Sequence, residues 1–561
     1  MLSRTAGSGL SAASTIWRPE KSASSHKHQD ITTMRPHFDF YALTLAITLA
    51  LMAPAHAYEP TVKAGAEPAL DAIALADHGL TTALAALPEL VNNTLERSGV
   101  PGAAVAVVHE GKTVFAQGFG VRELDRHEPI DPSTVFQIAS ISKSLTATVI
   151  AMAVTKNVVS WDDPVLHHLP KFQLSDPYVT AHATIGDFMA HRSGLPLAAG
   201  DELEDLGYGR EQVIERLSQL PLDAFRNSYH YANFGTTIAA VAVAAAANKP
   251  WEKLAAETLF EPLGMQSTST LHADYVAREN RAVLHAYEAG RFQPLYDRDP
   301  DAQAPAGGVS SNVLDLAKWM KFLLADGKHQ GKPLATPASL LAALSPRSLS
   351  GPPRTPLARS QFYGYGFNVG TTAGGHTTFG HSGAFLLGAG TAFQILPAAG
   401  VGIVVLTNGS PVGVPESINA SFMDMVQFGK PLRDWYGAYH ATMMDFYTPE
   451  GDLAGKTRPD DPLPAQPLQA YTGYYENAYF GTARIVLEDD TLALIIGPGK
   501  QRLTMSHWNA DTFAVTPQTE NAPLGSQSSV SFLMDDNKIN AFAVNYLDQN
   551  GLATWHRRAT Q

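Results

Sequence analysis

FQIASISKSLTA, residues 136–147, places Ser140 three positions before Lys143 at the head of an apolar run. Positions i and i+3 share one face of a helix, so the serine hydroxyl and the lysine ammonium can point into the same pocket. Residues 145–154 are apolar or small, which is typical of a buried helix. Burial favours loss of the lysine proton, and a deprotonated lysine beside a hydroxyl can activate a serine nucleophile. The stretch therefore predicts a buried helix that carries a nucleophile and its base.

The S-x-x-K pattern is short and also occurs at residues 24–27, so other segments have to support it. Tyr231 and Asn233 lie in HYANFG, directly ahead of an Ala/Val-rich helix expected at 236–247. A tyrosine can relay protons when a nearby cation lowers its pKa, and an asparagine can bridge a lysine and a substrate amide. The alternative for Tyr231 is a core tyrosine whose hydroxyl is satisfied within the fold.

A third segment, GHSGA at residues 380–384, precedes a strand expected at 391–396. Small residues let a substrate backbone approach the edge of a strand, and let a backbone N–H point at a developing oxyanion. His381 would offer a hydrogen-bond donor near the substrate, with Gly383 and Ala384 beside it. The alternative is a glycine-rich turn with an exposed histidine.

The composition limits the range of functions. At 561 residues the chain is expected to form two domains. A net charge of −13 argues against nucleic acid or an anionic membrane as the main partner. The absence of cysteine excludes disulfides, thiolate nucleophiles and cysteine-based metal sites.

The N-terminal region predicts export. Residues 1–33 are polar and read as a disordered tail or a mis-assigned start, with Met34 as the true first residue. Residues 34–57 combine a short basic head, an apolar stretch and an A-x-A cleavage site, which is the pattern of a signal peptide. A membrane anchor is the alternative, but the apolar stretch is short for a span and Pro54 interrupts it. We expect a periplasmic or secreted protein with no integral membrane span after cleavage.

Local patterns predict further elements of two different kinds. In the first part we expect helices at 84–97, 184–196, 311–325 (with a serine N-cap), 416–428 and 432–446, and strands at 102–109, 113–120, 391–396 and 401–407. Residues 449–467 are rich in Pro, Asp and Gly and predict a linker. Six short strand candidates follow, at 471–475, 483–487, 492–496, 513–516, 530–534 and 539–544, and predict a small all-β barrel at 468–561.

The order S-x-x-K, Y-x-N, H-x-G resembles the serine β-lactamase and penicillin-binding-protein family, in its class C-like branch with D-aminopeptidases and carboxylesterases. Flanking segments agree: FQIA at 136–139, HRSGLP at 191–196, PLGM at 262–265, PAGGV at 305–309 and YGF at 365–367. The last hundred residues resemble a lipocalin-like β domain. The resemblance implies an α/β (α+β) fold, with an antiparallel sheet flanked by helices plus a helical subdomain, over residues 85–448.

The resemblance also implies roles for single residues. Ser140 attacks a carbonyl and is acylated, and Lys143 and Tyr231 act as base and then as acid. Asn233 orients Lys143 and the substrate, while the backbone N–H groups of Ser140 and Ala384 form the oxyanion hole. Neither a metal nor a cofactor is implied, and the substrate is a small molecule or a short peptide. Nothing in the sequence indicates the oligomeric state.

One departure from the family pattern bears on the substrate. Most β-lactamases and transpeptidases carry lysine where this chain has His381, and that lysine helps to hold a substrate carboxylate. A histidine is mostly neutral at pH 7, which favours an esterase or a D-amino acid peptidase. A β-lactamase, and a sensor-like protein that acylates without turnover, stay open as alternatives. A triad hydrolase has less support, because no G-x-S-x-G elbow accompanies His191 and Ser193.

Overall fold

The computed structural model of the protein describes residues 72–558 except residue 537. The predicted tail at 1–33 and the predicted signal peptide at 34–57 lie outside the described residues. Among the helices within residues 72–558, none combines the length and hydropathy that a bilayer span requires.

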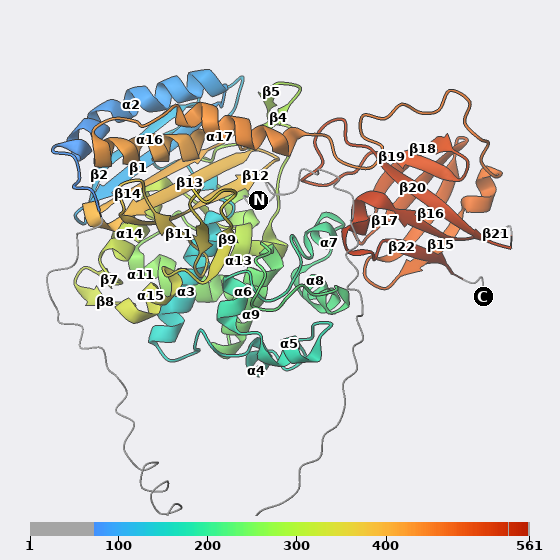
Figure 1. Ribbon diagram of the computed structural model, residues 1–561, viewed down its shortest axis with the longest axis horizontal. Coiled ribbons are helices and arrows are strands. Elements are labelled where there is room, and N and C mark those ends of the chain that lie inside the picture. Colours follow the sequence, from blue (N-terminus) through green and yellow to red (C-terminus); the bar gives the residue numbers. More distant parts are fainter. Residues whose placement is uncertain (1–71, 537, 559–561) are drawn as a thin grey trace, which may run out of the picture. The chain divides into compact units, whose positions relative to one another are not determined.

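An eight-stranded antiparallel sheet forms the centre of the first part of the chain (Figure 1), in the order β2-β1-β14-β13-β12-β11-β10-β9. The strands are β1 Gly102–His109, β2 Lys112–Gly120, β9 Ser348–Gly351, β10 Gln361–Tyr363, β11 Asn368–Thr371, β12 Thr377–Phe385, β13 Ala389–Leu396 and β14 Val401–Thr407. Side chains of β1 alternate between two cores. Val105 and Val107 belong to one core, and Ala104 and Ala106 belong to the other. The sheet is therefore buried on both faces.

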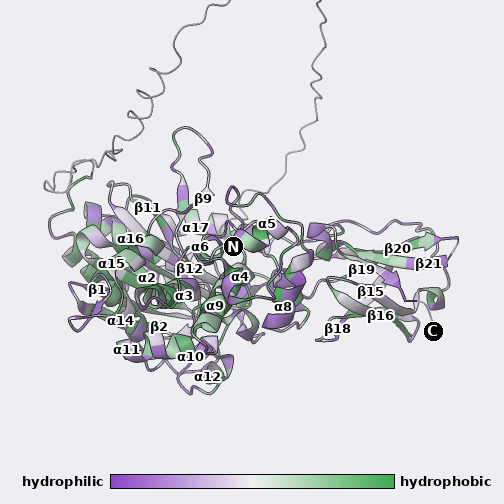
Figure 2. Ribbon diagram, turned by 90° about the horizontal axis from the view of Figure 1, so that it is seen from below, coloured by the Kyte–Doolittle hydropathy of each residue, from purple (hydrophilic) through white to green (hydrophobic). Residues whose placement is uncertain are grey.

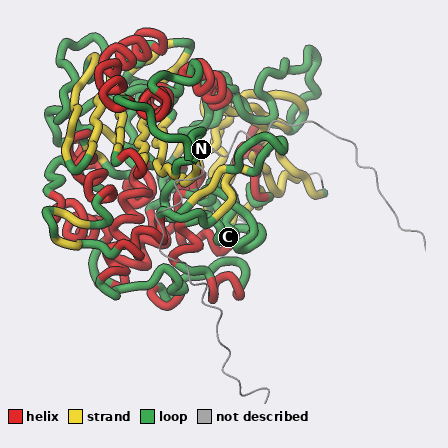
Figure 3. The backbone as a smooth tube through the Cα atoms, turned by 60° about the vertical axis from the view of Figure 1, so that its left-hand side comes forward, coloured by secondary structure: helices red, strands yellow, loops and turns green. Residues whose placement is uncertain are grey.

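Helices cover both faces of this sheet (Figure 3). One face packs against α2 (Gly79–Ser98) and α16 (Val414–Phe428), whose apolar side chains share a core with β1 and β14. Helix α17 (Trp435–Met443) packs on α16. The opposite face packs against α3 (Ile141–Thr155) and α14 (Val313–Leu324).

A helical part lies beyond α3. It contains α4 Val165–His168, α5 Pro177–His182, α6 Ile185–Met189, α7 Asp201–Asp205, α8 Arg210–Arg216, α9 Asn233–Ala246, α10 Trp251–Ala255, α11 Glu261–Leu263, α12 His272–Val276, α13 Ala304–Gly307 and α15 Pro337–Ala343. Figure 2 shows the hydropathy difference between the Ala/Val-rich α9 and the hydrophilic α8. Short strand pairs join β3 (Phe136–Gln137) to β6 (Ser310–Ser311), β4 (Ala286–Glu288) to β5 (Arg291–Gln293), and β7 (Lys328–His329) to β8 (Lys332–Pro333).

The C-terminal part is a closed antiparallel barrel of eight consecutive strands. They are β15 Gly473–Asn477, β16 Gly481–Glu488, β17 Thr491–Ile496, β18 Gln501–Asn509, β19 Thr512–Val515, β20 Ser528–Asp535, β21 Lys538–Val544 and β22 Thr554–Arg557. Phe532 lies opposite Phe542, and Phe542 lies opposite Trp555, so the three rings share the inner face. These buried rings fill the interior of the barrel.

The barrel is joined to the helical part by direct hydrogen bonds. Tyr208 donates its hydroxyl to the Phe480 carbonyl at 2.9 Å, and Tyr479 donates to Glu202 Oε1 at 2.6 Å. Arg216 Nη1 donates to the Ala478 carbonyl at 3.0 Å. The turn between β15 and β16 therefore rests on α7 and α8.

The predicted fold class is confirmed, but several element predictions were wrong in detail. The helix expected at 184–196 ends at Met189, because His191 takes a left-handed backbone conformation with φ 54°. The cap of α14 is Asn312, whose Oδ1 accepts from the Asp315 N–H at 2.9 Å, rather than a serine. Strands β18 and β22 were missed: β18 has only Leu503, Met505 and Trp508 as apolar residues among nine, and β22 is four residues long with Trp555 as its one apolar residue.

Candidate active site

A strained turn places Ser140 at the entrance of α3. Ala139 has φ 46°, a left-handed conformation that is uncommon for a residue with a side chain. The Ser142 hydroxyl donates to the Ala139 carbonyl at 2.6 Å and accepts from the Val309 N–H at 3.0 Å. The turn is thus held between α3 and the segment that follows α13, and Ser140 directly precedes the first residue of the helix.

Lys143 is fully buried, one turn into the helix. Its Nζ lies 3.1 Å from Ser140 Oγ, 2.7 Å from Asn233 Oδ1 and 2.8 Å from the Ala306 carbonyl oxygen. Burial lowers the pKa of Lys143 to about 7, and the charge of Asp201 opposes this shift. Near neutral pH the amine is thus available both with and without its third proton, as the sequence predicts.

The Y-x-N motif contacts the S-x-x-K motif at Lys143. Asn233 is the first residue of α9; its Oδ1 accepts from Lys143, and its Nδ2 donates to Asp201 Oδ2 at 3.0 Å. Tyr231 presents its ring face to Lys143 Nζ, 4.6 Å from the ring centroid, and its hydroxyl is hydrogen-bonded to Ser140. The structure therefore brings Ser140, Lys143, Tyr231 and Asn233 together.

The expectation that a cation lowers the Tyr231 pKa was wrong. Removal of the hydroxyl from water raises this pKa well above its ordinary value, and the hydrogen bond to Ser140 opposes the shift only in part. A lysine that readily loses its own proton supplies little charge to stabilise a phenolate. Tyr231 is thus a phenol at neutral pH, and Lys143 is the stronger candidate for the base.

His191, considered above as a triad fragment, supports Tyr231. Its ring centroid lies 4.4 Å from that of Tyr231, and its Nδ1 accepts from the Ala232 N–H at 3.3 Å. The His191 carbonyl also accepts from the His230 N–H at 3.0 Å. These contacts fix the backbone of the Y-x-N motif.

The third motif lies in β12, beside Ser140. Strand β12 pairs with β13 over residues 379–385, but its pairing with β11 spans only 377–380. A side chain at Gly383 would collide with the Ile138 carbonyl oxygen and would lie 3.0 Å from the Ser140 nitrogen. Only glycine therefore lets β12 approach the Ser140 turn this closely. The oxyanion hole of the Ser140 and Ala384 N–H groups stays a prediction.

His381 has a different environment from the one expected. It is buried, its Nδ1 lies 2.6 Å from the Ser382 carbonyl oxygen, and its Nε2 lies 2.8 Å from the Tyr363 hydroxyl. Burial lowers its pKa to about 3, so the ring is neutral, as anticipated. Since Nδ1 must donate to the carbonyl, Nε2 accepts from Tyr363. The ring has no N–H left for a substrate, which contradicts the expected free donor.

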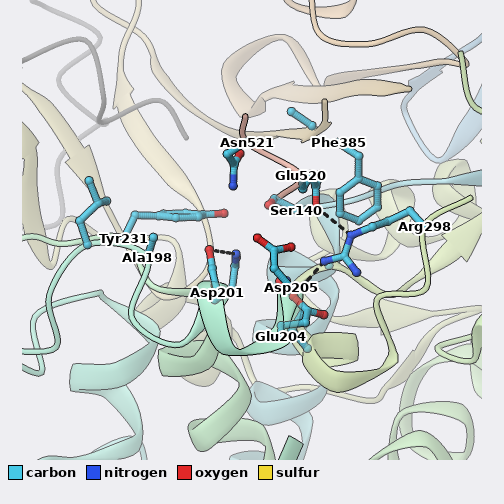
Figure 4. Close-up of a pocket in the computed structure, with 15 residues that line it drawn as sticks. Ser140, Ala198, Asp201, Glu204, Asp205, Tyr231, Arg298, Phe385, Glu520 and Asn521 are labelled. Carbon is cyan, nitrogen blue, oxygen red and sulfur yellow. Dashed lines mark hydrogen bonds and ion pairs between the residues drawn. The ribbon is translucent and has the colours of Figure 1, made fainter. Parts of the chain in front are cut away.

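Ser140 borders two cavities. One, of about 510 Å³, is lined by Tyr231, Tyr363, His381 and Ala384 together with residues of β11 and α17. The other, of about 60 Å³, is lined by Ser140, Tyr231, Asn233 and Ala384 and by several carboxyl groups (Figure 4). A carbonyl carbon at Ser140 can therefore place one substituent in each cavity.

Sequence reasoning missed the residues that close the smaller cavity. Asp201, Glu204 and Asp205 come from the acidic helix α7, Arg298 comes from the loop after β5, and Glu520 and Asn521 come from the loop between β19 and β20. The run DELED at 201–205 was a visible signal, whereas nothing local marked Glu520. Within residues 72–558, no three His, Asp or Glu side chains are arranged to hold a metal ion.

A serine beside a buried lysine, with a tyrosine and an asparagine, between an antiparallel sheet and a helical part, defines a serine hydrolase of the β-lactamase type. The chain belongs to the Beta-lactamase family, whose sequence model matches residues 87–424. Residues 457–555 match a second family, described as a domain of unknown function (DUF3471).

Curated relatives agree with this assignment. The chain is 27% identical over 432 residues to unguisins hydrolase ungD of Aspergillus violaceofuscus (strain CBS 115571), covering 69% of this chain and 74% of the relative. It is 28% identical to unguisins hydrolase ungD' of Aspergillus campestris (strain IBT 28561), over 57% of this chain and only 60% of the relative. Penicillin-binding protein 4 of Amycolatopsis lactamdurans is 28% identical, over 55% of this chain and 81% of its own.

A solved structure shares the fold. The octameric penicillin-binding protein homologue from Pyrococcus abyssi superposes with a TM-score of 0.55 at 20% identity, covering 84% of this chain and 99% of the other.

Proposed function

We propose that this protein is an exported serine hydrolase that cleaves an ester or amide through an acyl-enzyme on Ser140. The observation that carries the proposal is the environment of Lys143. Its buried Nζ lies 3.1 Å from Ser140 Oγ, and its pKa is lowered to about 7. Export rests on the signal-peptide pattern at 34–57 alone.

The hydrogen bonds of Lys143 give the order of proton transfers. The neutral amine donates its two protons to Asn233 Oδ1 and the Ala306 carbonyl, and directs its lone pair at the Ser140 hydroxyl. Ser140 Oγ attacks the carbonyl carbon as its proton passes to Lys143. The N–H groups of Ser140 and Ala384 hold the oxyanion. Lys143, with Tyr231 as relay, then protonates the leaving group, and water hydrolyses the acyl-enzyme by the reverse sequence.

The polar groups around Ser140 favour esterase or D-amino acid peptidase activity. His381 is neutral and both its nitrogens are engaged, so it provides no charge for a substrate carboxylate. Two relatives named unguisins hydrolase support hydrolysis as the reaction. A relative named penicillin-binding protein 4 supports the alternatives, a β-lactamase or a sensor that acylates without turnover.

Intact-mass measurement tests the proposal. The protein and its Ser140→Ala variant are mixed with a chromogenic ester and, separately, with a β-lactam. We expect a transient ester-derived adduct with turnover, absent from the variant. A permanent β-lactam adduct without turnover would support the sensor instead, and turnover that persists in the variant would overturn the role of Ser140.

A further inference from the structure

The smaller cavity beside Ser140 has a wall rich in carboxyl groups. Asp201 and Asp205 from α7 face it, and the barrel contributes Glu520. In Figure 4 the carboxyl group of Asp205 points toward Ser140, and Glu520 approaches from the opposite side. The volume of this cavity is about 60 Å³. A water molecule occupies about 30 Å³ of liquid, so the space suits a small group such as an ammonium and its carbon.

The residues that line this cavity include four carboxylic acids but only one arginine, Arg298. Arg298 Nη2 lies 2.9 Å from Glu204 Oε2, and its Nε lies 2.7 Å from Glu520 Oε2. One guanidinium thus forms ion pairs with two carboxylates, while Asp201 and Asp205 have no ion pair with an arginine among the described residues and Asp205 is influenced by the Arg298 charge only at longer range. Burial and neighbouring acids raise the pKa of Asp201, and raise that of Asp205 to about 8. Both groups therefore hold a proton near neutral pH, and a cation bound beside them would lower their pKa values and ionise them.

Three buried oxygen atoms in the same wall have no hydrogen-bond partner in the part of the chain that the structure describes. They are Asp201 Oδ1, Glu204 Oε1 and Glu520 Oε1. The side chains of Glu204 and Glu520 are only 7% and 10% exposed, so water does not readily replace the missing partners. A buried polar atom without a partner is costly, and a ligand with several donors removes that cost. Metal binding fits less well, since no three acids within residues 72–558 have metal-ligand geometry.

We propose that this acidic cavity binds a protonated amine carried by the acyl part of the substrate, so that the enzyme prefers α-aminoacyl esters or amides. An ammonium has three donors for the unpartnered oxygens, and an α-amine lies two bonds from the carbonyl that Ser140 attacks. The leaving group then occupies the cavity of about 510 Å³. The barrel, through Glu520, determines substrate specificity. This inference rests on the proposed acyl-enzyme function.

A pair of isosteric substrates tests the inference. The 4-nitrobenzyl esters of alanine, as either enantiomer, and of isobutyric acid differ only in an ammonium replacing a methyl group. At pH 7 we expect kcat/KM of the wild-type protein to favour the better alanine ester by roughly 10- to 100-fold, the range for hydrogen bonds to charged groups. Equal rates, or a preference for isobutyrate, would overturn the inference without any variant.

Three variants locate the selectivity. Glu520→Gln and Asp205→Asn should each lower the alanine-to-isobutyrate ratio of kcat/KM by about threefold or more. Glu488→Gln, the same substitution at an exposed barrel site paired with Arg502, should leave the ratio unchanged. An unchanged ratio in both cavity variants would place the amine elsewhere and overturn the inference. If neither ester shows Ser140-dependent hydrolysis, the proposed function itself fails, and the inference fails with it.

Discussion

Within residues 72–558, two antiparallel β structures have eight strands each, and they differ in how completely their strands are paired. In the barrel every strand has two neighbours, and aromatic rings fill the interior. In the open sheet, β11 pairs with β12 only as far as Gly380, and the next residues of β12 lie beside Ser140. The interrupted pairing leaves a strand edge available to a substrate. The closed barrel instead contributes through a loop outside its interior.

The largest expected effect is on kcat, when the nucleophile Ser140 beside the open sheet is replaced. Ser140→Ala removes the nucleophile, and we expect kcat for a neutral ester to fall by about 10⁴-fold or more. Ser144→Ala is the matched control, because the hydroxyl of this buried serine on the same helix donates to the Gly366 carbonyl, at 2.6 Å. The control should keep kcat within about tenfold of the wild-type value. Comparable losses in both variants would indicate a damaged helix instead.

The second largest effect is expected when the general base, Lys143, is replaced. Lys143→Met should lower kcat/KM by about 10³-fold, since general-base catalysis typically contributes 10²- to 10⁴-fold. In the wild-type protein the amine must lose a proton before it can accept one from Ser140. With a Lys143 pKa of about 7, kcat/KM should rise about tenfold per pH unit below this value and level off above it. A pH–rate profile on a neutral ester measures this, and a midpoint near that of free lysine would contradict the assignment.

A substitution in the barrel interior is expected to change the free energy of unfolding rather than the catalytic rate. Trp555 is fully buried and stacks on Phe542, with ring centroids 5.2 Å apart. Trp555→Ala should reduce the free energy of unfolding by about 3–5 kcal/mol, the usual cost of removing a large core ring. Urea denaturation followed by fluorescence measures the loss. A loss below about 1 kcal/mol would show that the rings do not pack as a core.

A methyl group added at Gly383 tests whether activity requires the close approach of β12 to the Ser140 turn. Gly383→Ala should lower kcat/KM by about 10²-fold, comparable to the loss of one oxyanion donor, because the strand must move away from Ser140. Gly209→Ala is the control: its φ is −74°, and only Gln212 Oε1 lies within 4 Å of the added carbon, at 3.8 Å. A fully active Gly383→Ala enzyme would refute the proposed role of this strand edge.

The smallest effect is expected on the barrel surface. Glu488 pairs with Arg502, and both side chains are about half exposed. Glu488→Gln should change the free energy of unfolding by less than about 1 kcal/mol and leave kcat/KM unaltered. Denaturation and steady-state kinetics on the same preparation provide both values.

Features that depend on the spacing of neighbouring residues could be predicted from the sequence. Ser140 and Lys143 were found because three residues on a helix bring their side chains together, and β1 was found because Val and Ala occupy both faces of a buried strand. Contacts between segments far apart in the sequence could not be predicted from local patterns. Helix α6 ends at Met189 because His191 takes a left-handed conformation, and the His191 carbonyl then accepts from His230, a contact between segments well apart in sequence. Glu520 was missed because the barrel fold, rather than any local motif, brings it to the cavity.

The origin of Glu520 has a consequence for biosynthesis. The serine, the lysine and the tyrosine are all made before the ribosome reaches the barrel, but the wall of the smaller cavity is completed by a residue near the C-terminus. A nascent or C-terminally truncated chain would therefore carry the nucleophile and its base without this part of the cavity. Under the proposed amine specificity, substrate selection requires translation past residue 520, whereas the serine–lysine pair does not.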